Sequence, residues 1–69
     1  MEIMGVVQSK RQARRLLDEI AVSGGWRAAG YTETGVLYRK GDEELMIIKK
    51  AERQWEIVKR RREASKVGP

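Results

Sequence analysis

Residues 36–48 read VLYRKGDEELMII, and this stretch decides the fold because it suits either a β-hairpin or the start of a long helix. A two-residue turn at Gly41-Asp42 would place opposite charges and apolar side chains across from one another. The facing pairs are Lys40–Glu43, Arg39–Glu44, Tyr38–Leu45, Leu37–Met46 and Val36–Ile47. Each such pair contributes about 0.2–1 kcal/mol to a sheet, so the sequence predicts a hairpin here.

The alternative is a helix capped by Asp42. In such a helix one face would be apolar, because apolar residues recur at helical spacing: Leu45, Ile48, Ala51, Trp55 and Val58. The run MII at residues 46–48 is continuous and partly β-branched, which is more typical of a buried strand than of a helix surface. We therefore favour the hairpin.

Upstream, residues 9–23 carry the signals of an amphipathic helix. Ser9 and Gln12 have the spacing of a capping box, in which the Ser9 hydroxyl accepts from the Gln12 amide and the Gln12 side chain reaches back to the Ser9 amide. Gly24 suits the left-handed residue that closes a helix. The apolar face consists of Ala13, Leu16, Leu17, Ile20 and Ala21.

The segments on either side of these two elements give weaker signals. Residues 25–31 (GWRAAGY) suit a short strand, and 32–35 (TETG) suit a turn. Residues 1–8 are either an extra short strand, through Ile3, Val6 and Val7, or a loose arm.

From about residue 51 the pattern turns helical. A narrow apolar stripe is formed by Ala51, Trp55 and Val58. Arg62 occupies the next position on the stripe, so the last turns, through Lys66, should project beyond the core as a basic helix. Residues 67–69 should be a frayed tail.

These elements predict one α+β domain spanning residues 1–69, with a folded core at 9–66 built as helix, three-stranded antiparallel sheet and helix. That order of elements resembles the double-stranded-RNA-binding-domain arrangement, which HicA-type RNA-cleaving toxins also resemble. The resemblance is one of topology alone. The catalytic histidine of the toxin family has no counterpart, because the chain has no His.

The composition excludes several kinds of chemistry. With no Cys and no His, the chain lacks thiol nucleophiles, disulfides and the usual transition-metal ligands, so we expect no cofactor and no enzymatic activity. A ribonuclease working through Arg, Lys and Tyr is the weak enzymatic alternative. We expect no membrane segment and a cytoplasmic location. Because a core this small supplies little stability, a homodimer is a further possibility.

The charge favours binding as the function. Fifteen Lys and Arg against ten Asp and Glu give a net charge of +5, and the surplus falls on the two predicted helices. In the first helix the cations crowd the start, where the helix dipole disfavours them by about 0.3–1 kcal/mol each, so a phosphate-binding role would explain their position. Plain solvated charge, with Arg14–Asp18 and Arg15–Glu19 pairs, is the competing explanation.

The sequence thus predicts a non-enzymatic domain that binds RNA or DNA through phosphate contacts from its two basic helices. The candidate contact residues are Lys10, Arg11, Arg14, Arg15, Lys49, Lys50, Arg53, Lys59, Arg60, Arg61 and Arg62. The alternative is a small regulator, inhibitor or subunit of phage or mobile-element type that binds a partner protein through an acidic patch on that partner.

Overall fold

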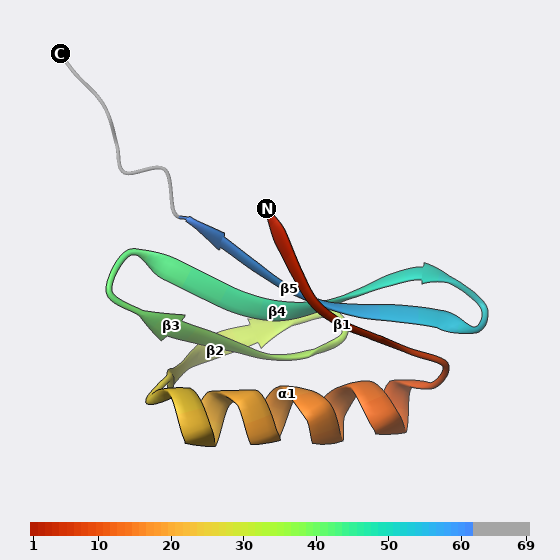
Figure 1. The fold of residues 1–69 in the computed structure, drawn as a ribbon, viewed down its shortest axis with the longest axis horizontal. Coiled ribbons are helices and arrows are strands. Elements are labelled where there is room, and N and C mark those ends of the chain that lie inside the picture. Colours follow the sequence, from red (N-terminus) through yellow and green to blue (C-terminus); the bar gives the residue numbers. More distant parts are fainter. Residues whose placement is uncertain (62–69) are drawn as a thin grey trace, which may run out of the picture.

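A computed structural model describes residues 1–61 as one helix on a five-stranded antiparallel sheet (Figure 1). The elements in chain order are β1 (Glu2–Val7), α1 (Lys10–Gly24), β2 (Arg27–Thr32), β3 (Gly35–Lys40), β4 (Glu43–Ala51) and β5 (Gln54–Arg61). The strand order is β1-β5-β4-β3-β2, so the chain crosses from one edge of the sheet to the other through α1 and then returns by three successive hairpins.

The helix predicted over 9–23 is confirmed. The Ser9 hydroxyl accepts from the Gln12 amide at 3.1 Å, as the capping box requires. The Gln12 side chain accepts from the amide of Gln8, also at 3.1 Å, and not from that of Ser9. The left-handed residue that closes the helix is Gly25, with φ 75°, one position after the expected Gly24.

The hairpin is confirmed in the half next to its turn. Gly41 has a φ of 63°, and β3 pairs with β4 at Tyr38–Leu45, Arg39–Glu44 and Lys40–Glu43. The two further predicted pairs, Leu37–Met46 and Val36–Ile47, lie outside this ladder. Beyond it, the Thr34 hydroxyl donates to the Ile47 carbonyl at 2.6 Å, so a side chain connects the strands where the ladder has ended.

The predicted C-terminal helix is wrong for the part of it that the structure describes. The chain turns at residues 52–53 and returns as β5, paired with β4 from Glu43–Arg61 to Ala51–Gln54. Ile57 and Val58 explain the error, because they are 0% and 1% exposed although they project to opposite faces of the strand. A strand buried on both faces loses the alternation by which strands are recognised. Residues 62–69, with the end of that helix and the frayed tail, lie outside the described residues.

The expected fold class therefore has to be corrected. Strands make up 57% of the described chain, and there is one helix, so the α+β label fits only loosely. Residues 1–8 supply a full edge strand, and the helix–three-strand–helix order does not occur. The resemblance to the double-stranded-RNA-binding arrangement is lost with it.

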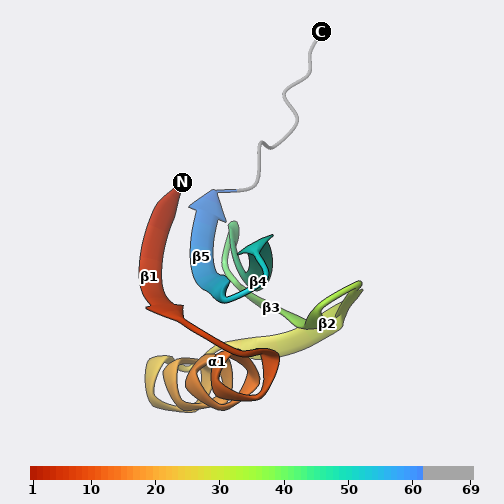
Figure 2. The ribbon, with the colours of Figure 1, turned by 90° about the vertical axis from the view of Figure 1, so that its right-hand side faces the viewer.

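The core lies between α1 and one face of the sheet. The buried side chains that form it are Ala13, Leu17 and Ala21 from α1 and Leu45, Ile47 and Ile57 from β4 and β5. Trp26, Tyr38 and Trp55 pack at its margin. Figure 2 shows that the sheet is strongly curved, and α1 makes its contacts with β1, β4 and β5.

The sheet face opposite α1 also has buried side chains. Met46 and Val58 project there and are 9% and 1% exposed, although α1 covers the other face (Figure 2). Among residues 1–61, no helix has the length and apolar character that crossing a bilayer requires.

Candidate nucleic-acid interface

The first turns of α1 present four exposed cations that form no ion pair with the described residues. Lys10, Arg11, Arg14 and Arg15 are all exposed. Within residues 1–61, none of their side chains forms an ion pair, so the predicted Arg14–Asp18 and Arg15–Glu19 pairs are absent. Asp18 instead accepts a 2.8 Å hydrogen bond from the Tyr38 hydroxyl, which ties it to the sheet.

The end of β4 and its turn into β5 present three more cations at the same end of the molecule. Val7, at the end of β1, pairs with Trp55, at the start of β5, so the chain enters α1 beside this turn. Figure 1 likewise places the start of α1 and the β4–β5 turn at one end. We call this set the basic end, and it consists of Lys10, Arg11, Arg14, Arg15, Lys49, Lys50 and Arg53.

The basic end concentrates the charge of the chain. Residues 10–15 and 49–54 contain seven cations and one carboxylate, Glu52, so their net charge is 7 − 1 = +6, against +5 for the whole chain. The Lys49 ammonium lies 4.0 Å from Glu52, whose side chain is 92% exposed, and 5.3 Å from the centroid of the Trp55 ring. A surface hollow of about 460 Å³ is lined by Lys10, Arg11 and Arg14.

The candidate residues at the other end of β5 are placed differently. Lys59 lies 3.3 Å from Glu2, Arg60 lies 3.1 Å from Glu44, and Arg61 lies 3.8 Å from Asp42. Antiparallel pairing creates these contacts, because β5 runs beside the acidic starts of both β1 and β4. Three cations expected on a projecting helix are therefore ion-paired on the sheet. Arg62 lies outside the described residues.

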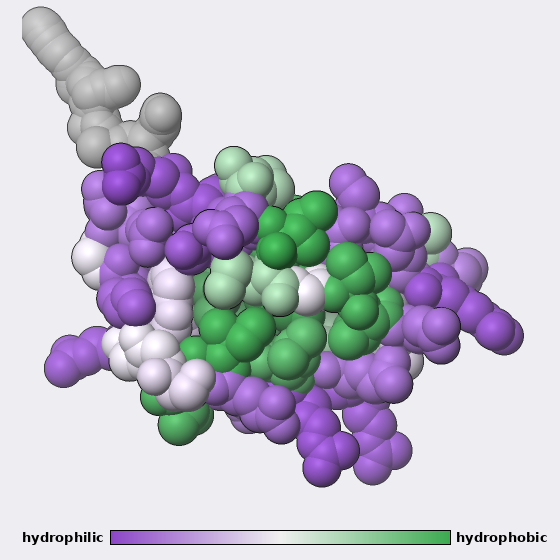
Figure 3. Space-filling model, viewed as in Figure 1, coloured by the Kyte–Doolittle hydropathy of each residue, from purple (hydrophilic) through white to green (hydrophobic). Residues whose placement is uncertain are grey.

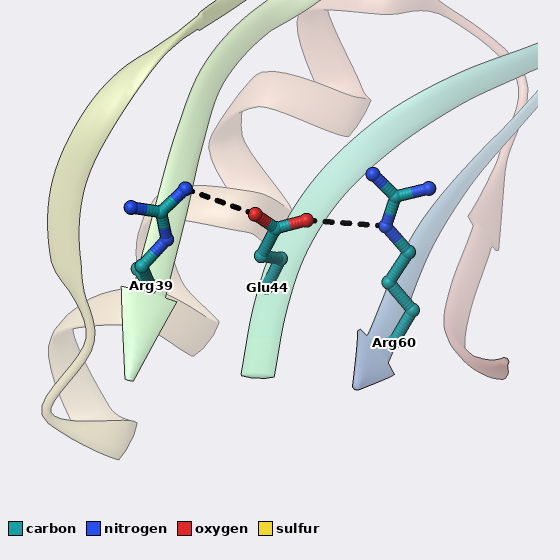
Figure 4. Close-up of polar contacts among 3 residues, drawn as sticks. All are labelled: Arg39, Glu44 and Arg60. Carbon is teal, nitrogen blue, oxygen red and sulfur yellow. Dashed lines mark hydrogen bonds and ion pairs between the residues drawn. The ribbon is translucent and has the colours of Figure 1, made fainter. Parts of the chain in front are cut away.

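Glu44 is the centre of this second cluster (Figure 4). The residue is 6% exposed, and its carboxylate accepts from Arg39 Nη2 at 3.0 Å and from Arg60 Nε at 3.1 Å. The hydrogen bond from Arg39, helped by the one from Arg60, holds the pKa of Glu44 below its usual value in spite of burial, which acts to raise it. The sequence predicted the Arg39 pair but not Arg60, because that contact depends on the unrecognised strand β5.

Tyr38 and the carboxylates are the remaining groups of the described residues that could take part in chemistry. The Tyr38 pKa is raised, chiefly by the hydrogen bond to Asp18, so the phenol stays protonated at neutral pH. Within residues 1–61, no three carboxylates gather closely enough to hold a metal ion. The ion-paired cluster around Glu44 is explained by stability, and the basic end is left as the candidate site.

In comparisons with known proteins, no family model, no curated protein and no solved structure matches this chain. Fold and charge alone therefore define its class, a small basic domain whose described residues form five antiparallel strands and one helix.

Proposed function

We propose that this domain binds nucleic acid through phosphate contacts made by the basic end, without catalysis. The observation that carries the proposal is the contrast between the two ends of β5. At one end, Lys59, Arg60 and Arg61 each have a carboxylate partner. At the other, the four cations of α1 have none among the described residues, and they lie at the same end of the molecule as the end of β4 and its turn into β5, which contain Lys49, Lys50 and Arg53.

This arrangement suits a polyanion better than a single acidic group. The cations come from two separate elements, so a ligand that contacts both has to extend across them. Exposed Lys and Arg side chains of this kind contact phosphate oxygens, which carry no sequence information. The proposal therefore includes binding to RNA or DNA with little dependence on sequence, and it no longer includes a second basic helix.

A charge-matched pair of variants tests the proposal. Arg11→Gln/Arg14→Gln removes two cations from the basic end. Arg27→Gln/Arg61→Gln removes the same charge elsewhere, at an exposed position of β2 and at a side chain that is 75% exposed. Affinity for labelled duplex RNA, duplex DNA and single strands would be measured by fluorescence anisotropy.

We expect the first variant to weaken binding by about the same factor for every nucleic-acid sequence. The slope of log affinity against log salt concentration should fall in magnitude by about 2, or about 1 for each lost phosphate contact. The second variant should bind like the wild type. Equal losses in both variants would mean that net charge alone governs binding, and the basic end would lose its proposed role.

A second candidate function is the binding of a partner protein, and the exposed cations of α1 favour it, because they would suit an acidic patch on that partner. A pull-down from nuclease-treated extract separates the two candidates. A protein retained after nucleic acid has been destroyed would support this second function.

A further inference from the structure

The edge strand β1 has an exposed apolar surface. Among residues 1–61, six large apolar residues are exposed, and four of them lie in the first six positions: Met1, Ile3, Met4 and Val6. Figure 3 shows apolar surface gathered over β1 and the adjoining side of α1. On α1, Leu16 and Ile20 are half-buried, and Leu16 lies next to Gly5. A contiguous apolar surface of this kind marks an interaction site more often than scattered single residues do.

A β-bulge places Ile3 and Val6 on the same face of β1. The register with β5 shifts between Ile3 and Gly5, so that Ile3 lies opposite Val58 and Val6 lies opposite Glu56. Residues 56 and 58 of a strand project to one face, and their cross-strand neighbours project with them. Ile3 and Val6, three positions apart, would face opposite ways in a regular strand.

The free edge of β1 has little protection against pairing. An edge strand leaves a row of backbone N–H and C=O groups without strand partners, and proteins usually guard it with Pro or with outward charges. β1 has the bulge at Met4 but no Pro, and its single charged residue, Glu2, is ion-paired with Lys59. The opposite edge, β2, contains Arg27 and has Tyr31 as its exposed large apolar residue.

We propose that a second copy of this chain pairs antiparallel with the free edge of β1, about a two-fold axis between Met4 and Gly5. In this register the position numbers of facing residues sum to nine. Ile3 then faces Val6 of the second copy, and Val6 faces Ile3, so both exposed side chains meet an apolar neighbour. Met4 faces Gly5, which places a long side chain beside a residue without one. A two-fold interface must be self-complementary in this way.

The charge distribution favours a second copy as the occupant. The chain has a net charge of +5, but residues 1–8 contain no Lys or Arg and one carboxylate. A segment without Lys or Arg adds little to the repulsion between two identical cationic chains that approach through it. A two-fold axis perpendicular to the sheet also puts both α1 helices on the same face. Leu16, beside Gly5 in each copy, then lies near the interface.

The oligomeric state in solution tests the inference. Sedimentation velocity of the full chain, from micromolar to millimolar concentration, should show a shift from monomer to twice the monomer mass. Ile3→Ser/Val6→Ser should remain monomeric over the same range with an unchanged circular dichroism spectrum, because both side chains are more than half exposed. The matched control, Val22→Ser/Tyr31→Ser, alters side chains that are 82% and 84% exposed elsewhere and should dimerise like the wild type. A monomeric wild type, or dimerisation lost only in the control, would overturn the proposal.

Cysteine cross-linking tests the register, because the chain contains no Cys of its own. Under oxidation, a mixture of Ile3→Cys and Val6→Cys chains should give a disulfide-linked dimer in much higher yield than either variant alone. Efficient cross-linking of Ile3→Cys with itself would contradict the proposed two-fold axis. The dimer and the proposed nucleic-acid binding involve different residues, so either can fail without the other.

Discussion

Replacing Glu44 by Gln tests the buried ion cluster, because it removes the charge and keeps the size of the side chain. The two arginine contacts at 3.0 and 3.1 Å would lose their charged acceptor. The loss is larger at Arg39 than at Arg60, because the Nε of Arg39 is already buried without a hydrogen-bond partner among the described residues. The Arg60 side chain is 51% exposed, so water compensates for part of its loss. Hydrogen bonds to charged groups contribute about 1.5–3 kcal/mol each, and after this discount we expect a total loss of about 2–3 kcal/mol.

Thermal and urea unfolding measure this loss. For a domain of this size, 1 kcal/mol shifts the Tm by about 4–8 °C, so Glu44→Gln should lower it by at least about 8 °C. Glu52→Gln makes the same chemical change at a side chain that is 92% exposed and 4.0 Å from Lys49, and it should stay within about 0.5 kcal/mol of the wild type. Equal effects of the two substitutions would refute the assignment of Glu44 as a structural centre.

Glu44→Gln also tests how the stability of the wild type depends on pH. The folded-state pKa of Glu44 lies below the usual value of 4.5, so the unfolded chain takes up the proton more readily. The stabilisation is therefore present above that value and is lost as the pH falls through the folded-state pKa. The free-energy difference between wild type and Glu44→Gln should shrink on acidification below about pH 4.5. A difference that stays constant from neutral to strongly acidic pH would contradict this reasoning.

Three further substitutions test the fold. Ile57→Ala should cost about 2–5 kcal/mol in denaturant unfolding, because this side chain is fully buried in the core. In the predicted C-terminal helix, Ile57 would lie outside the apolar stripe and the substitution would be tolerated. Ser9→Ala should cost about 1 kcal/mol and lower the helical circular dichroism signal, through the loss of the hydrogen bond from Gln12. Tyr38→Phe should cost about 0.5–1.5 kcal/mol through the bond to Asp18, and an unchanged midpoint would show that this bond contributes nothing in solution.

Local signals explain which elements could be predicted from the sequence. The helix has its cap at Ser9 and its apolar face within one continuous segment. The first hairpin has a Gly-containing turn flanked by complementary side chains. Both elements depend on neighbours in sequence, and both are present.

The last hairpin lacked such signals. Its turn, at residues 52–53, is Glu-Arg, with none of the Gly, Pro, Asn or Asp that usually marks a turn. Trp55 and Val58 have helical spacing by coincidence, because they project to opposite faces of β5. Recognising β5 would have required knowing that both of its faces become buried, which only the tertiary fold decides.

The candidate site was predicted in its parts but not in its arrangement. The unusual position of the α1 cations, at the helix end that disfavours them, is visible in the sequence. Their convergence with Lys49, Lys50 and Arg53 follows from the pairing of β1 with β5, which the sequence did not reveal. The same pairing brings Glu2 to Lys59 and so takes a candidate cation out of the site.

The salt dependence of binding tests the central claim most directly. Affinity of the wild-type domain for duplex RNA, duplex DNA and single strands would be compared at low and at physiological salt. If the seven cations of the basic end contact phosphates, affinity should fall by about 10³–10⁵ between about 50 and 200 mM salt, and the Arg11→Gln/Arg14→Gln variant should show a shallower slope. Binding that is weak at low salt for every nucleic acid, or that has the same slope in the variant, would contradict the claim.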